Sequence, residues 1–220
     1  MKRFSLVALF CLIPLVLFAA DSKTGMIKVN GTELYYETIG EGTPILILHG
    51  GPGLNHSYFL PQMAGLAKNH KLIFFDQRAT GKSSMKLDTS AVNLKNCLGD
   101  IEGLRKAFKL GKMNLMGHSF GGLLAMEYAM KYPKNLRSLT LVCTSAPSSA
   151  LRMKAFMNMQ SKQSPEDSAG QAQIMQSDGF KRRDPETMSK FFHFLFSSDF
   201  YDRKMDDSLT LQFDTNYAKS

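Results

Sequence analysis

Cysteine and histidine are scarce in this chain, and basic runs are missing from it. The 220 residues include three cysteines and five histidines, and no two histidines stand at ligand spacing with a carboxylate or a thiol. No metal site is therefore expected, and nothing in the sequence implies a cofactor. The net charge of +8 comes from dispersed lysine and arginine residues. Dispersed charge is typical of a solvated surface, so we expect no nucleic-acid partner.

Hydrophobic residues make up 44% of the sequence, which is enough to build a core and excludes a disordered chain. Internal repeats and low-complexity segments are absent. The length suits one domain with room for a small insertion.

The N-terminus has the pattern of a secretory signal peptide. A basic pair, Lys2 and Arg3, precedes the apolar stretch 4–20, and the composition then turns polar. An uncleaved membrane anchor is the alternative, but the stretch is shorter than a bilayer span and Pro14 interrupts it. We therefore expect residues 1–20 to direct export to the periplasm or the medium, with no other membrane contact.

Two cysteines, Cys97 and Cys143, remain after the predicted processing. In an oxidising compartment they could pair. Both also lie in strongly apolar patterns, where a buried free thiol is an equally good prediction.

Buried strands alternate with helices in the first two thirds of the chain. Continuous apolar runs indicate strands covered on both faces, and the helical segments between them indicate crossovers of a mostly parallel α/β sheet. A start signal at Asp88-Thr89-Ser90 predicts an amphipathic helix that packs on this sheet. The expected strands are Thr32–Ile39, Pro44–His49, Lys71–Phe75, Met113–Gly117 and Leu139–Cys143.

The pattern changes after residue 146, where methionine, phenylalanine and polar residues mix at helical spacing. One helix there is well specified, because Asp184 is a good capping residue and Pro185 fits the first turn. We expect residues 21–146 to form the core and residues 147–220 to form a helical cap.

Residues 117–121, Gly-His-Ser-Phe-Gly, fall at a junction between an apolar strand and an apolar helix. This is the context of a nucleophile elbow, in which a sharp turn pushes the serine side chain outward. The strained backbone leaves no room for side chains at the flanking positions, which explains the glycines. Ser119 is therefore the candidate nucleophile.

Residues 49–53, His-Gly-Gly-Pro-Gly, follow an earlier predicted strand. Acyl transfer needs backbone N–H groups that stabilise a developing oxyanion, and a glycine loop lets such a group approach closely. The N–H groups of Gly51 and Phe120 are our candidates for this role. For His49 we expect a structural role in holding the loop.

Residues 76–83, Asp-Gln-Arg-Ala-Thr-Gly-Lys-Ser, imitate the end of a phosphate-binding loop. The imitation fails because Asp76 stands where that loop needs glycine, so ATP binding is not expected. Asp76 and Arg78 are predicted to brace neighbouring loops through charge-assisted hydrogen bonds. A substrate contact is the alternative for Arg78, and Gly50 and His118 are further candidate substrate-binding residues.

These motifs together resemble the α/β-hydrolase fold, particularly its proline iminopeptidase-like branch, over residues 26–146. The resemblance implies that Ser119 is the nucleophile, that Gly51 and Phe120 form the oxyanion hole and that a helical cap covers the pocket. It implies a small peptide or ester as substrate. Phe120 stands where iminopeptidases usually carry tryptophan, and the Gly-His-Ser context also resembles general esterases, so a carboxylesterase is an alternative.

The family orders its triad as serine, then aspartate or glutamate, then histidine on later loops. Only His193 follows Ser119, and its spacing assigns it to the polar face of a cap helix rather than to the site. The chain thus resembles the front two thirds of a hydrolase, with the last strands missing. Three hypotheses about function remain: a serine hydrolase, a catalytically incomplete hydrolase without the triad acid and histidine, and a binding module that reuses the fold.

Overall fold

A computed structural model describes residues 22–51, 53–60, 62–83, 88–197, 200–202, 205, 211 and 213. The predicted signal segment, residues 1–20, lies outside the described residues. Within the described part of the chain, no helix combines the length and the apolar character that crossing a membrane requires.

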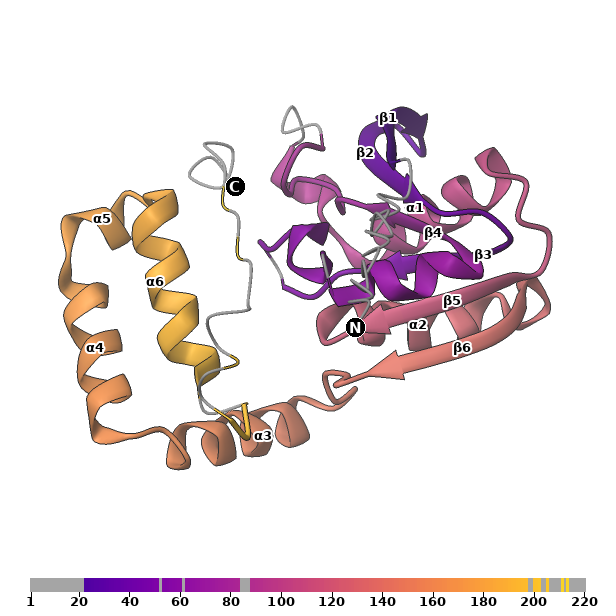
Figure 1. The fold of residues 1–220 in the computed structure, drawn as a ribbon. Helices are drawn as coiled ribbons and strands as arrows, with labels where there is room; N and C mark the ends of the chain where they lie inside the picture. Colours follow the sequence, from indigo (N-terminus) through magenta and orange to yellow (C-terminus); the bar gives the residue numbers. More distant parts are fainter. Residues whose placement is uncertain are drawn as a thin grey trace, which may run out of the picture.

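Six strands form one sheet in the order β1-β2-β4-β3-β5-β6 (Figure 1). The first two strands and β4 pair antiparallel, whereas β4, β3, β5 and β6 run parallel. The mostly parallel sheet predicted from the apolar runs is confirmed, but the first strand was not predicted, because its apolar residues are few. The strands are β1 Ser22–Val29, β2 Thr32–Ile39, β3 Thr43–Leu48, β4 His70–Phe75, β5 Met113–His118 and β6 Leu136–Val142.

The central strands are buried on both faces, as their continuous apolar runs predict. Side chains alternate across a strand. Leu46 and Ile73 therefore join the core under helices α1 and α2, while Ile47 and Phe74 join a second core under the 3-10 segments η1 and η2. These helical segments are α1 Leu94–Ala107, α2 Phe120–Lys131, η1 His56–Phe59 and η2 Gln62–Lys68, with η3 Thr89–Ala91 and η4 Pro133–Asn135 as short connections.

Helix α1 starts later than the sequence pattern suggested. Asp88 and Ser90 close a local turn, in which the Asp88 carboxylate accepts the Ser90 N–H. The cap is Asn93, whose side chain accepts the N–H of Asn96 at 2.9 Å. Asp88 and Asn93 are both residues that favour a helix start. The Asp88 side chain instead closes the local turn, so the helix begins after Asn93.

Strand β6 departs from the expectation of burial on both faces. It lies at the edge of the sheet, and Leu139, Leu141 and Val142 remain 37–43% exposed. Cys143 is exposed as well, and it and Cys97 are both free thiols. Of the two alternatives, the structure has free thiols rather than a disulfide, but the predicted burial is wrong for Cys143.

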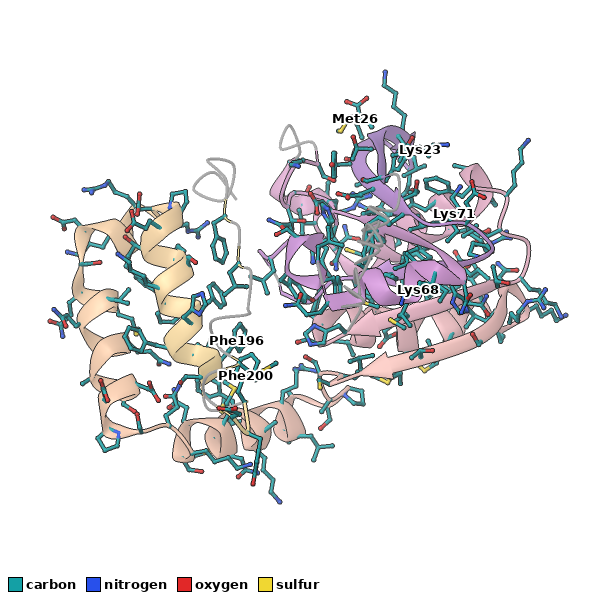
Figure 2. All side chains as sticks on the ribbon, in the orientation of Figure 1. Lys23, Met26, Lys68, Lys71, Phe196 and Phe200 are labelled. Atoms are coloured by element: carbon teal, nitrogen blue, oxygen red, sulfur yellow. The ribbon has the colours of Figure 1, made fainter. Side chains whose placement is uncertain are left out.

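After β6 the described chain is helical, with α3 Ser149–Ser161, α4 Pro165–Gln176, α5 Asp178–Lys181 and α6 Pro185–Phe196, which we call the cap helices. Figure 1 shows α3 leading away from the sheet and α4 beside α6. The prediction that Asp184 caps the N-terminus of α6 is confirmed, because its side chain accepts the Thr187 N–H. Phe196, at the end of this helix (Figure 2), stacks on Phe192.

Candidate functional site

Ser119 lies between β5 and α2 with a backbone that L-residues rarely adopt, φ 53° and ψ −119°. It is the only serine with a positive φ among the described residues. Its N–H donates to the Val142 carbonyl at 3.1 Å, and its carbonyl accepts from the Ser145 N–H at 3.0 Å. The turn is thus tied to the end of β6, and Ser119 is half-buried.

The two glycines of the Gly-x-Ser-x-Gly motif are required by packing. A Cβ added at Gly117 would lie 2.7 Å from the Gly122 Cα, and one at Gly121 would meet the carbonyl oxygens of Leu48 and His49. Both contacts involve backbone, which cannot move away cheaply. The turn therefore excludes any larger residue at either position, as the sequence pattern predicted.

The glycine loop lies directly beside this turn. Strands β3 and β5 are adjacent and parallel, with Leu48 opposite Gly117, so both end at the same edge of the sheet. A Cβ added at Gly50 would lie 3.0 Å from the Ser119 Cβ. Gly51 has a φ of 130°, a conformation that requires glycine.

The two N–H groups proposed as oxyanion donors have no other acceptor among the described residues. Phe120 opens helix α2, where the first N–H groups lack partners inside the helix. The N–H of Gly51 is likewise not donated to another described group. The start of α2 also adds a favourable positive dipole end.

His49 holds the glycine loop, as predicted. The ring is buried, and its Nε2 accepts the Gln77 N–H at 3.0 Å. The proton therefore sits on Nδ1, which donates to the Gly50 carbonyl at 2.6 Å. Burial lowers the pKa of His49 from 6.5 to about 4, against the opposing charge of Asp76, so the ring stays neutral.

Gly50 and His118, two of the candidate substrate-binding residues, have structural partners instead. The Gly50 N–H donates to the Tyr58 hydroxyl at 2.6 Å, and the same hydroxyl lies 2.7 Å from His118 Nδ1. Together with the bond from His49, this occupies both backbone polar groups of Gly50. The roles of Gly50 and His118 in substrate binding stay predictions.

Asp76 braces two loops at the end of β4. Its Oδ1 accepts from the His56 N–H at 3.0 Å and faces His56 Nδ1 at 2.6 Å, while Oδ2 accepts the Lys82 N–H at 2.8 Å. Burial acts to raise the pKa of Asp76, but the hydrogen bond and the charge of His56 lower it overall. The predicted bracing role of Asp76 is confirmed.

The sequence pattern did not predict a role for His56 or Tyr58. The ring of His56 lies between Asp76 and Glu37, whose Oε2 is 3.2 Å from Nε2. Burial acts to lower the pKa of His56, yet the hydrogen bonds and charges of both carboxylates raise it overall. Asn55, a good capping residue, could have indicated the start of η1. This helix places His56 against Asp76 and Tyr58 against Gly50.

Arg78 also has the bracing role predicted for it. Its guanidinium forms a two-pronged pair with Asp100, with Nε 2.7 Å from Oδ2, and donates to the Ala91 carbonyl at 2.9 Å. The side chains of both partners are 3% exposed. Arg78 also lines the cavity described below, so a substrate contact of this residue stays a prediction.

A cavity of about 1070 Å³ lies between the core and the cap helices. Phe120 and Glu127 line it from α2, and Met175, Phe180 and Met188 line it from the cap. Ser119 itself is not among the lining residues, but its neighbour Phe120 is. The cavity therefore lies next to the elbow and is mostly apolar, which is typical of a small-molecule site.

A general base for Ser119 is not found among the described residues, where its hydroxyl makes no hydrogen bond to a histidine or a carboxylate. His193 lies on α6, as predicted, and is not among the residues that line the cavity.

Several known proteins are similar to this chain. It is 34% identical over 128 residues to a proline iminopeptidase of Heyndrickxia coagulans, a match that covers 56% of this chain and 44% of the relative. Among solved structures it resembles a proline iminopeptidase-related protein of Thermus thermophilus, with a TM-score of 0.52, 24% identity and coverage of 61% and 55% of the two chains. It also resembles an epoxide hydrolase of Vigna radiata, with a TM-score of 0.53, 21% identity and coverage of 66% and 48% of the two chains.

The chain spans about half the length of the curated relatives it matches. The two structural likenesses, both below 25% identity, show the fold alone. A family model described as the alpha/beta hydrolase fold matches residues 43–216, which is most of the sequence. With the parallel sheet and the strained turn at Ser119, this match identifies the chain as a member of the α/β-hydrolase fold family.

Proposed function

We propose that this chain carries the nucleophile of a serine hydrolase that works through a covalent acyl-enzyme. The observation that carries the proposal is the backbone of Ser119, with φ 53° and ψ −119°, at a strand-to-helix junction beside a glycine loop. An ordinary glycine-rich turn does not require this strain, which persists only where the surrounding structure enforces it.

In the proposed reaction, Ser119 Oγ loses its proton to a base and bonds to the substrate carbonyl carbon. The carbonyl oxygen then becomes an oxyanion, which the N–H groups of Gly51 and Phe120 stabilise. Collapse of this intermediate expels the amine or alcohol with a proton, and water later releases the acid from the serine.

As substrates we propose peptides with an N-terminal proline, and small esters or amides as a second class. The names of the curated relatives support the first class. The mostly apolar cavity beside Phe120 supports an apolar acyl group, which a prolyl peptide and a simple ester both provide. A carboxylesterase is therefore kept as the alternative activity.

A second candidate is a catalytically incomplete hydrolase. It is favoured by one observation, that no histidine ring forms a hydrogen bond with the Ser119 hydroxyl in the described part of the chain. Loss of the base from a serine triad costs on the order of 10⁶ in kcat. We propose that, in an active enzyme, sequence outside the described residues supplies the base.

Replacement of Ser119 tests the proposal. Hydrolysis of p-nitrophenyl acetate and of prolyl-naphthylamide is measured for the chain, for Ser119→Ala and for Ser138→Ala, a serine on β6 whose hydroxyl bonds Asn114. In a protein that includes the base, we expect Ser119→Ala to lower kcat by about 10⁴-fold or more and Ser138→Ala to leave it unchanged. Turnover that survives Ser119→Ala would contradict the proposal, and turnover near background in all three proteins favours the incomplete hydrolase.

We also propose export through the segment 1–20, on the strength of its basic pair and its apolar stretch. N-terminal sequencing of exported protein is expected to start close to Asp21. Intact Met1 in a carbonate-resistant membrane fraction would indicate an anchor instead.

A further inference from the structure

One hydroxyl joins the glycine loop to the nucleophile turn. The Tyr58 oxygen lies 2.6 Å from the Gly50 nitrogen and 2.7 Å from His118 Nδ1, and His118 directly precedes Ser119. Tyr58 is itself held in place by its short helix, since its ring packs on Phe59 at 4.4 Å between centroids. The two halves of the proposed oxyanion hole therefore share this side chain.

The direction of each bond follows from the donors available. The Gly50 backbone nitrogen can only donate, so the Tyr58 oxygen accepts that bond. Burial raises the pKa of Tyr58, and the bond from Gly50 offsets this only partly, so the hydroxyl keeps its proton. Burial lowers the pKa of His118, so its ring stays neutral. The hydroxyl proton is therefore donated to His118 Nδ1, and His118 carries its own proton on Nε2.

The peptide group between Gly50 and Gly51 is held from the opposite end by His49, which donates to the Gly50 carbonyl at 2.6 Å. A trans peptide is planar, and its N–H points opposite to its carbonyl. Fixing the Gly50 carbonyl therefore directs the Gly51 N–H away from His49. The Gly50 N–H would compete as a donor if it were free, but Tyr58 accepts it.

We infer that Tyr58 is a positioning residue, whose hydroxyl takes up the Gly50 N–H and fixes the Gly50–Gly51 loop to His118 so that the Gly51 N–H is the donor presented beside Ser119. The inference rests on the proposed function, because it assigns a task within the same site. Tyr58 acts through the loop and does not touch the reacting atoms.

The experiment compares Tyr58→Phe with a matched control, Tyr128→Phe. Tyr128 is also buried, and its substitution removes a hydroxyl hydrogen bond to Glu102 at 2.7 Å, against two such bonds for Tyr58. It belongs to the core under α1 and α2. Both variants are measured for kcat and KM with p-nitrophenyl acetate in a protein that includes the base. Unfolding in urea and ¹⁵N NMR of the Gly50 and Gly51 amides and the His118 ring are measured as well. Ser119→Ala sets the activity floor.

We expect Tyr58→Phe to lower kcat about 10- to 100-fold with KM within about twofold, because a buried donor and a buried acceptor lose their partner beside the reacting groups. The Gly50, Gly51 and His118 signals are expected to shift in this variant alone. Tyr128→Phe is expected to lower stability without changing kcat. Equal kcat losses in the two variants, or wild-type kcat in Tyr58→Phe, would overturn the inference.

A second pair of variants covers the case in which Tyr58→Phe does not fold. His118→Asn retains an acceptor near the Nδ1 position, whereas His118→Leu removes it. We expect the asparagine variant to keep several-fold more activity than the leucine variant, and equal activities would contradict the inference.

Different results would contradict the proposed function and the inference about Tyr58. Turnover that does not depend on Ser119 contradicts the proposed function, and the NMR signals then decide the inference alone. Unchanged Gly51 and His118 signals in Tyr58→Phe would overturn it.

Discussion

Strands β4 and β6 were both predicted to be buried, but their surroundings differ. Residues Leu72 to Phe75 of β4 are at most 1% exposed, whereas Leu139, Leu141 and Val142 of β6 are 37–43% exposed. Strand β4 has a neighbour on each side and packing on both faces, while β6 is the edge strand. An apolar run therefore identifies a strand, and only its place in the sheet determines how much of it is buried.

The ion pairs of the core and the cap differ in the same way. The side chains of Arg78 and Asp100 are 3% exposed, whereas those of Lys190 and Glu186 on α6 are 64% and 79% exposed. The core pair connects the loop after β4 to helix α1, and the cap pair joins two neighbouring turns of one helix. Burial and sequence separation thus distinguish a structural brace from a surface contact.

The largest expected effect is on the buried pair. Asp100→Ala should lower the free energy of unfolding by about 3 to 5 kcal/mol, because it leaves the Arg78 charge buried without its partner. Glu186→Ala should change it by about 0.5 kcal/mol or less, since water screens the exposed pair. Urea unfolding of both variants measures the difference, and similar losses would break the comparison.

The apolar residues should show a smaller but parallel contrast. Leu46 is fully buried in β3. Leu46→Ala should therefore lower the free energy of unfolding by about 3 kcal/mol, through lost burial and the cavity left behind. Leu141→Ala on β6 should cost less than about 1 kcal/mol, because the side chain is already 43% exposed. A large loss for Leu141→Ala in the same urea assay would mean that β6 is covered in solution.

The smallest expected effect depends on pH and comes from His56. Its pKa is raised on folding, so its stabilising bonds to Asp76 and Glu37 are fully present below about pH 6.5 and are lost as the pH rises through the raised value. Asp76, whose pKa is lowered, keeps its contribution above about pH 3.8. His56→Gln should therefore cost about 1.5 to 3 kcal/mol between these values and progressively less at higher pH.

Unfolding of the wild type and His56→Gln across pH 5 to 9 checks this dependence. A difference that stays constant, or that grows with pH, would show that the ring is neutral in the folded chain. His49→Gln would not serve as the control, because the pKa of His49 shifts in the opposite direction.

Much of the candidate site could be predicted because it is encoded in short segments. The elbow at Ser119 and the loop at Gly51 need glycine at set spacings, and these spacings are visible without any structure. The bracing roles of Asp76 and Arg78 followed from charged residues placed at the end of a buried strand. Their partners, His56 and Asp100, could not be predicted, since each lies about twenty residues away on another element.

By itself, the sequence determined where strands, helices and the strained turn form, because periodicity, capping residues and glycine act over a few neighbouring residues. The tertiary structure decided the rest. It left Leu139 and Leu141 of β6 partly exposed, brought Tyr58 between Gly50 and His118, and placed the His56 ring between two carboxylates. Burial and hydrogen bonding between distant segments depend on how the strands are ordered, and no local pattern carries that order.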